Sequence, residues 1–168
     1  GEYTAKKVVM SCGGKAFPTA GGTGLGLDVI KNLGHKITPI SPALCPIQVN
    51  SCYIKNLKGI RAKAEVTLFD GSKALKSEVG EVQFTDNALS GICVFNLTTL
   101  LPKTKNPIIS VNLTKDYSYI ELLNLLYDRK KLFANEPLEE FFTGLFHKKI
   151  GTALIKSITN KALTESCK

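Results

Sequence analysis

The sequence predicts an α+β protein in which strands come first and a cluster of about three helices comes last. Three observations support this fold class. Apolar and polar residues alternate in several runs between residues 60 and 113, as in half-buried strands. Apolar residues recur at helical spacing from residue 118 onward. A glycine-rich stretch precedes both parts and links a short apolar run to a predicted helix.

The glycine-rich stretch predicts a strand, a loop and a helix in that order. A strand is expected at 8–10 and ends before the pair Gly13-Gly14, and a helix is expected from Leu25 to Leu33, closed by Gly34. Because glycine lacks a Cβ and tolerates positive φ, this segment lets the backbone approach a ligand closely, and a nucleotide cofactor is the natural candidate.

Two phosphate-binding motifs are excluded in this stretch. Leu27 occupies the last position of a Gly-x-Gly-x-x-Gly fingerprint, and the preceding strand is about ten residues too early. A P-loop is excluded because Val9 replaces its leading glycine and Ala16 its magnesium-binding hydroxyl. On turn chemistry alone, an ordinary glycine-rich surface turn is the alternative interpretation.

A proline-containing connector at 39–46 indicates a boundary between two units. Alternation at 60–68 then predicts a half-buried strand, and Asp70-Gly71 predicts a hairpin turn that returns through one or two strands at 74–85. The apolar run at 92–97 fits a helix or a buried strand, and Ser90 as an N-cap favours the helix.

The remaining chain is expected to hold one more strand and three helices. Alternation predicts the strand at 109–113. Ser118 and Glu121 have capping-box spacing and open a helix with a broad apolar face up to residue 132. Pro137 predicts the first turn of a second helix over 138–145, and a third helix is expected over about 148–163.

Length and composition indicate an ordered protein. The 168 residues are 43% hydrophobic, which is enough to bury a core. No apolar stretch reaches the roughly 20 residues that span a bilayer, and no charged-then-apolar leader opens the chain, so a soluble protein without a membrane partner is expected. Because Gly1 rather than Met comes first, we interpret the chain as a piece of a longer protein.

The cysteines and histidines predict neither disulfides nor a metal. Five cysteines, an odd number without a Cys-x-x-Cys pair, favour a reduced, cytoplasmic setting. The two histidines, His35 and His147, are far apart and lack metal-ligand neighbours at recognisable spacing, so no metal site is expected.

The net charge of +8 favours anionic partners in general, but the positive residues are dispersed in small groups. We therefore expect solvated faces rather than a nucleic-acid patch. A basic strand-rich module that binds single-stranded nucleic acid or another acidic partner is the alternative function. Against it, aromatic residues make up only 8% of the chain and tryptophan is absent.

Several short stretches carry a resemblance to a known family. Gly-Gly-Thr-Gly-Leu-Gly at 21–26 is similar to that family's Gly-Ser-Thr-Gly-Asp-Gly loop, and Leu-Gly-His at 33–35 to its helix ending. Pro-Ala-Leu-Cys-Pro-Ile at 42–47, Gly-Glu-Val-Gln-Phe-Thr at 80–85 and Leu-Ser-Gly at 89–91 also have counterparts. Through these stretches the chain resembles the aminoacetone oxidase-like NAD(P)/FAD-dependent oxidoreductases.

The resemblance implies a split FAD-binding domain into which a small barrel and a helical cluster are inserted. Residues 1–40 would be the flanking strand, loop and helix of the FAD-binding domain, 41–116 the barrel-like unit, and 117–168 the helical cluster. The partner would be the remainder of the FAD-binding domain. The chain would cover the flavin and shape the substrate entrance, with NAD(P)H as an electron donor, and would be inactive alone.

The same resemblance implies site residues, whereas no catalytic residue is assigned because the flavin carries the electron chemistry. Three departures from the family pattern are Leu25 in place of Asp, Ser11-Cys12 in place of Ala-Thr, and Asp86 in place of His. The implied FAD-contacting residues are Cys12, Gly13, Gly14, Lys15, Gly22, Thr23 and Gly24, and the implied substrate-pocket residues are Thr85, Ser90 and Gly91.

Overall fold

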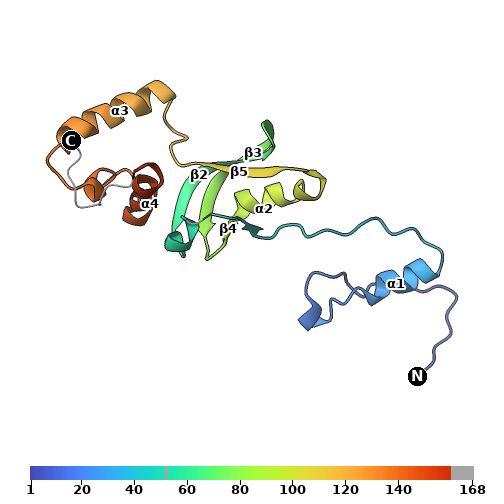
Figure 1. Cartoon of the computed structure of the whole chain (residues 1–168). Helices are drawn as coiled ribbons and strands as arrows, with labels where there is room; N and C mark the ends of the chain where they lie inside the picture. Colours follow the sequence, from blue (N-terminus) through green and yellow to red (C-terminus); the bar gives the residue numbers. More distant parts are fainter. Residues whose placement is uncertain (52, 160–168) are drawn as a thin grey trace. The chain divides into compact units, whose positions relative to one another are not determined.

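The computed structural model describes residues 1–51 and 53–159 and divides into two compact units, one ending at Pro42 and one beginning at Ala43. The first unit is blue in Figure 1 and contains the 3₁₀ turn η1 (Pro18–Ala20) and helix α1 (Leu25–Asn32). The second unit contains the sheet and the remaining helices. The predicted division into domains at 1–40, 41–116 and 117–168 stays a prediction.

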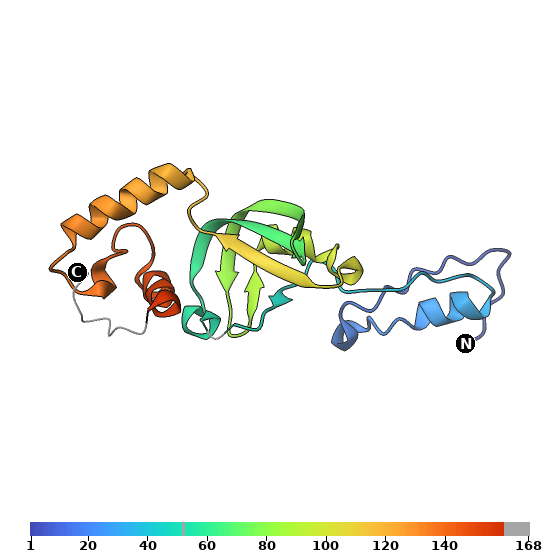
Figure 2. The ribbon, with the colours of Figure 1, turned by 45° about the horizontal axis from the view of Figure 1, so that its top comes forward.

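An antiparallel sheet forms the centre of the second unit. Among the described residues it has five strands in the order β1-β4-β3-β2-β5, and Figure 2 shows them curling into a half-barrel. This curled sheet, followed by helices, confirms the predicted α+β, barrel-like fold class. The strands are β1 (Ile47–Gln48), β2 (Arg61–Asp70), β3 (Lys73–Phe84), β4 (Ala88–Ser90) and β5 (Pro107–Asn112).

The core lies on the concave face of β2 and β3, where helix α2 (Ile92–Thr98) packs against the sheet. Ala64, Val66 and Leu68 on β2 are fully buried and alternate with accessible neighbours, which confirms the predicted strand face. From α2, Leu97 is likewise fully buried. Burying a side chain such as Leu68 or Leu97 contributes about 1.5–3 kcal/mol, so this contact is a main source of stability.

The predicted Asp70-Gly71 hairpin is confirmed, and β3 returns as one strand. Asp70 pairs with Lys73, and Gly71 takes a φ of +59° in the turn. The same turn holds β5, because Asp70 Oδ1 accepts a 2.8 Å hydrogen bond from the amide of Asn106. Gly71 donates its amide to the Asn106 carbonyl at 2.9 Å.

The helix at 92–97 is confirmed, but the predicted role of Ser90 as its N-cap is wrong. Ser90 is the last residue of strand β4, where it lies opposite Gln83. Gly91, with a φ of +114°, is the N-cap and makes no side-chain capping bond. The three-residue strand β4 is built by pairing with β1 and β3, which local sequence does not reveal.

Helix α3 (Tyr119–Leu132) begins with the predicted capping box. The Glu121 amide donates to Ser118 Oγ at 3.3 Å, and the Ser118 amide donates to a Glu121 carboxylate oxygen at 2.8 Å. These hydrogen bonds lower the pKa of Glu121. The broad apolar face of this helix is not covered by the described residues, since no α3 residue is buried and Ile120 is 69% exposed.

The predicted helix over 138–145 is reduced to the short 3₁₀ turn η4 (Leu138–Glu140). Arg129 explains part of the difference, because its guanidinium donates 2.8 Å hydrogen bonds to the carbonyls of Phe141 and Thr143. Such side-chain bonds hold the backbone in a turn rather than a helical ladder. Gly144, with a φ of +80°, then redirects the chain.

Helix α4 (Lys148–Ile158) confirms the start of the third predicted helix and buries Ile150, Gly151 and Ile155. The structure ends it at Ile158, with Thr159 as the C-cap, rather than near residue 163. The rest of the predicted extent lies outside the described residues. The short connecting turns η2 (Ile54–Leu57) and η3 (Leu101–Lys103) complete the second unit.

In the first unit, helix α1 is confirmed between Gly24 and Gly34, but the strand expected at 8–10 is not formed. Val8 and Val9 are 76% and 87% exposed, and no described strand pairs with them. A strand needs a neighbour to satisfy its backbone groups, so β propensity alone does not produce one here.

Gly91→Ala is expected to destabilise the second unit by about 2–4 kcal/mol, because positive φ and overpacking both add cost. A Cβ on Gly91 would lie 2.2 Å from the carbonyl oxygen of Glu81. Gly71→Ala is the matched control, because Gly71 also has positive φ but no atom within 4 Å of the added carbon. Its expected cost is only about 1 kcal/mol. Urea unfolding measures both, and equal losses would contradict the close-contact explanation.

Candidate functional site

The glycine loop of the first unit folds back along the residues that precede it. A Cβ on Gly24 would lie 2.5 Å from Cε of Lys15, and one on Gly26 would lie 2.1 Å from Sγ of Cys12. Two glycines therefore let this loop and the preceding segment approach more closely than side chains allow. Of the predicted cofactor residues, this contact brings Cys12 and Lys15 beside the loop that contains Gly24.

Gly13 and Gly14 differ from these packed glycines because their surroundings are open. A Cβ on either would have no neighbour within 4 Å, and only Gly13 has positive φ, at +73°. Thr23 is exposed, and its amide donates to the Gly21 carbonyl at 2.8 Å. The segment thus offers an open glycine pair beside an exposed lysine, Lys15, which suits an anionic ligand that approaches the backbone.

The first unit buries little apolar surface of its own. Only Gly24 and Gly26 are buried in it, whereas Leu25, Val29 and Leu33 of helix α1 and its C-cap are 44–71% exposed. Exposed apolar side chains on one side of a helix are typical of a surface that contacts another protein element.

The predicted pocket residues Thr85, Ser90 and Gly91 have local structural contacts. The Thr85 hydroxyl donates to the Ala88 carbonyl at 2.9 Å and accepts from the Ala88 amide at 3.0 Å, which fixes the turn between β3 and β4. Gly91 lies against the backbone of β3. None of the three lines either of the two apolar hollows described below, and their assignment to a substrate pocket stays a prediction.

A cavity of about 780 Å³ in the half-barrel was not predicted from the sequence. Its walls come from strands β1 and β5, turn η2 and helix α4, which lie far apart in the chain. No Asp, Glu, Lys, Arg or His is among the lining residues. The apolar wall includes Ile47, Ile54, Leu57, Phe84, Leu89, Ile109, Val111, Ile150, Ala153 and Leu154.

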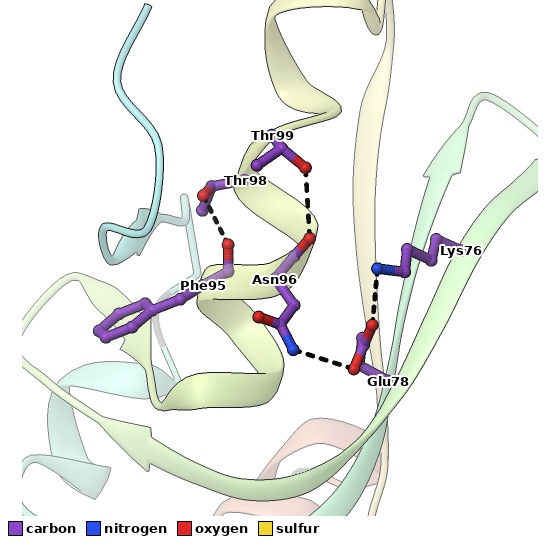
Figure 3. Close-up of polar contacts among 6 residues, drawn as sticks. All are labelled: Lys76, Glu78, Phe95, Asn96, Thr98 and Thr99. Atoms are coloured by element: carbon purple, nitrogen blue, oxygen red, sulfur yellow. Dashed lines mark hydrogen bonds and ion pairs between the residues drawn. The ribbon is translucent and has the colours of Figure 1, made fainter.

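A cluster of polar side chains connects α2 to β3, and it was not predicted from the sequence. Figure 3 shows Glu78 on β3 between Lys76, at 2.7 Å, and the side-chain amide of Asn96, at 3.2 Å. The hydrogen bond from Lys76, followed by that from Asn96, lowers the pKa of Glu78. Because all three groups satisfy one another, the cluster fixes α2 on the sheet and has no catalytic geometry.

Thr98 makes a second polar link beside this cluster. It is 1% exposed, and its hydroxyl donates to the Phe95 carbonyl at 2.7 Å, as drawn in Figure 3. The same oxygen accepts a 2.8 Å hydrogen bond from the amide of Leu44. The buried Thr98 hydroxyl therefore connects Leu44, in the segment before β1, to helix α2.

Among the described residues, six Lys and Arg side chains form ion pairs with acids at the surface. Lys58 contacts Asp86 at 2.8 Å and Arg61 contacts Glu81 at 3.2 Å. Lys148 lies 3.6 Å from Glu139 and 3.8 Å from Glu140, the acidic pair on η4. Pairing of this kind reduces the positive potential available to a nucleic acid.

Cysteine and metal chemistry have no assembled site among the described residues. Burial raises the pKa of the Cys93 thiol, whose hydrogen is directed to the Glu81 carbonyl at 3.4 Å. Cys93 thus behaves as a small apolar core residue, whereas Cys12 is exposed. No group of three potential metal ligands occurs in residues 1–51 and 53–159. No described helix has the length and apolar character to cross a membrane.

Comparison with known proteins identifies the second unit. A family model described as HI0933-like protein barrel and H2TH domain matches residues 41–168. The half-barrel agrees with the barrel of this description. The H2TH part agrees with helices α3 and α4, which are joined by the turn-rich segment around η4. The description names no aminoacetone oxidase, so that finer resemblance stays a prediction.

The 3-dehydro-bile acid delta(4,6)-reductase of Clostridium scindens is 27% identical over 158 residues. The match covers 92% of this chain, so it includes part of the glycine-rich first unit as well as the barrel. The chain spans 39% of the length of that relative.

Glu78→Gln is expected to lower the melting temperature at neutral pH, because the charged carboxylate holds Lys76 and Asn96. Since the folded-state pKa is lowered from 4.5, this stabilisation is present above pH 4.5 and is lost as the pH falls through the folded-state pKa. Melting curves between neutral and acidic pH measure the difference between the two proteins. Glu136→Gln is the control, because Glu136 is exposed and makes no ion pair within the described residues. A difference that persists unchanged below the folded-state pKa would contradict the assignment.

Proposed function

Because the chain belongs to the HI0933-like family with a barrel and an H2TH domain, we propose that it is the barrel-and-helix part of an FAD-dependent oxidoreductase. The observation that carries this proposal is the similarity to a reductase over 92% of the chain, which includes part of the glycine-rich first unit. Since the chain spans 39% of that relative, the proposed enzyme also contains the remainder of the FAD-binding domain.

The first unit supplies the proposed FAD contacts. Gly13 and Gly14 offer backbone without neighbouring side chains, and the nearby Lys15 suits a cofactor that carries a pyrophosphate. Gly22, Thr23 and Gly24 form the second half of the contact, and Cys12 lies against Gly26 at the start of α1. A Cβ on Gly13 or Gly14 would fill the space that the cofactor needs. FAD itself would supply the electron transfer.

The exposed apolar side chains of the first unit support a partner within the same enzyme. Leu25, Val29 and Leu33 would be covered by the remainder of the FAD-binding domain, which gives helix α1 the burial it lacks here. The second unit would then cover the flavin and shape the substrate entrance, with NAD(P)H as the electron donor and the cytoplasm as the compartment. The chain alone would be inactive.

Flavin content tests the proposal. The full-length protein should show a flavin absorption spectrum after purification, and the 168-residue chain should not. Gly14→Val in the full-length protein should reduce bound flavin at least about tenfold, a loss of about 1.4 kcal/mol in binding. Gly14 has ordinary φ and open surroundings, so valine disturbs a ligand that approaches it rather than the fold.

Gly13→Val and Gly34→Val form a matched pair for the same measurement. Both glycines have positive φ and no atom within 4 Å of an added Cβ, but only Gly13 belongs to the proposed FAD contact. Flavin loss is expected in the first variant and retention in the second. A colourless full-length protein that takes up no added FAD would refute the oxidoreductase proposal, and retained flavin in Gly13→Val and Gly14→Val would refute the placement.

A further inference from the structure

We propose that the cavity of the half-barrel binds a small, uncharged and largely apolar molecule. The cavity exists because the sheet does not close: β1 pairs with β4, β5 pairs with β2, and the two edge strands do not pair with each other. The space between them is bounded by η2 and α4 instead.

The volume of the cavity is that of a small-molecule site rather than of a void left by imperfect packing. Protein interiors are close-packed, with few voids larger than a water molecule. A volume of about 780 Å³ falls within the range of about 300–1,000 Å³ that is typical of small-molecule sites. The walls are structured, because Ile47, Leu57, Phe84 and Ile150 also belong to the buried core. Part of the apolar lining is therefore fixed by core packing before any ligand enters.

The charge distribution limits the ligand class. Among the residues that the structure describes, no Asp, Glu, Lys, Arg or His lines the cavity. Moving an unpaired charge into such a site is costly, so the body of the ligand must be uncharged. Most of the polar lining side chains come from the segment around β1 and η2, namely Gln48, Asn50, Ser51 and Tyr53, and Ser157 adds one from α4. They would orient a polar substituent of the ligand at that side.

Helix α4 separates this cavity from a second apolar hollow of about 310 Å³. Ala153 and Leu154 line the half-barrel cavity, whereas Ile155 and Ile158 line the hollow between α3 and α4. Ser157 lines the first, and its hydroxyl is occupied by a 2.7 Å hydrogen bond to the Leu154 carbonyl. The two faces of one helix therefore allow the two sites to be altered separately.

The identification of this ligand as the substrate rests on the proposed oxidoreductase function and makes that function more specific. A reductase whose barrel accepts an uncharged apolar body would act on a hydrophobic substrate. Binding to the cavity requires no flavin, so it can be measured whether or not the first unit contacts FAD.

The uncharged solvatochromic dye Nile red is the probe. Titration into the 168-residue chain should give a blue-shifted, saturable emission with one dye per chain. Ala153→Trp should weaken binding at least about tenfold, because the indole occupies the cavity. Leu123→Trp is the matched control, since Leu123 lines the hollow between α3 and α4 but not the half-barrel cavity. This control should leave the dye affinity unchanged.

Folding of each variant is checked through the introduced residue. The chain contains no tryptophan, so the emission of a single Trp reports its own surroundings. A blue-shifted emission from Ala153→Trp shows that the indole is buried in the folded cavity. Val111→Trp fills the same cavity from strand β5 and keeps the test valid if the α4 variant does not fold.

The proposal would be overturned if Nile red did not bind saturably to the wild-type chain, or if folded cavity variants bound it unchanged. It would also be overturned if Leu123→Trp lost as much dye affinity as the cavity variants. A fourth contradicting result is dye binding by the chain but not by the full-length protein. The last would mean that the protein's own residues fill the cavity. A colourless full-length protein that takes up no added FAD but still binds Nile red in this cavity would refute the flavoprotein function and leave the binding site intact.

Discussion

The packing of α2 against the concave face of β2 and β3 is the interaction on which the second unit depends. Leu97 and Val94 of α2 belong to one core cluster with Val66 and Leu68 of β2, and all four side chains are fully buried. Around this contact, Glu78 and Thr98 satisfy polar groups that would otherwise be costly to enclose. The cavity lies beside the same core, because its lining residues Ile109 and Val111 pair with Leu68 and Val66 of β2.

Glycine has two distinct physical uses in this chain. At Gly26 and Gly91, a missing Cβ lets two segments approach within a distance that any other residue would prevent. At Gly13 and Gly14, the backbone is bare and has no neighbour. The first use explains structure. Positive φ accounts for glycine at Gly13, whereas neither φ nor a close contact accounts for it at Gly14, which is why Gly14 supports a ligand contact.

The elements that sequence predicted correctly are those that local chemistry determines. Alternation places Val66 and Leu68 on one face whatever the topology, and Ser118 caps α3 within a single turn. The fold class follows from the order of such segments. By contrast, β4 depends on pairing with residues more than 30 positions earlier, and the turn at Phe141 depends on Arg129 of another helix.

The same distinction applies to the candidate site. The glycine-rich segment is contiguous, so both its composition and its resemblance to a family could be read from the sequence. The cavity joins Ile47, Ile109 and Leu154, and no local pattern connects residues so far apart. Its uncharged lining becomes visible only when the strands are arranged in space.

Strand β3 has one further property that follows from its length. It runs over 12 residues, but its pairing with β4 is confined to Gln83 and Phe84, so the edge at 73–77 faces no described strand. An unpaired edge is a template for aggregation between copies, and lysine is a residue that commonly prevents it. Lys73 and Lys76 occupy this edge. The lysine that holds Glu78 beneath α2 therefore also discourages two molecules from joining their sheets.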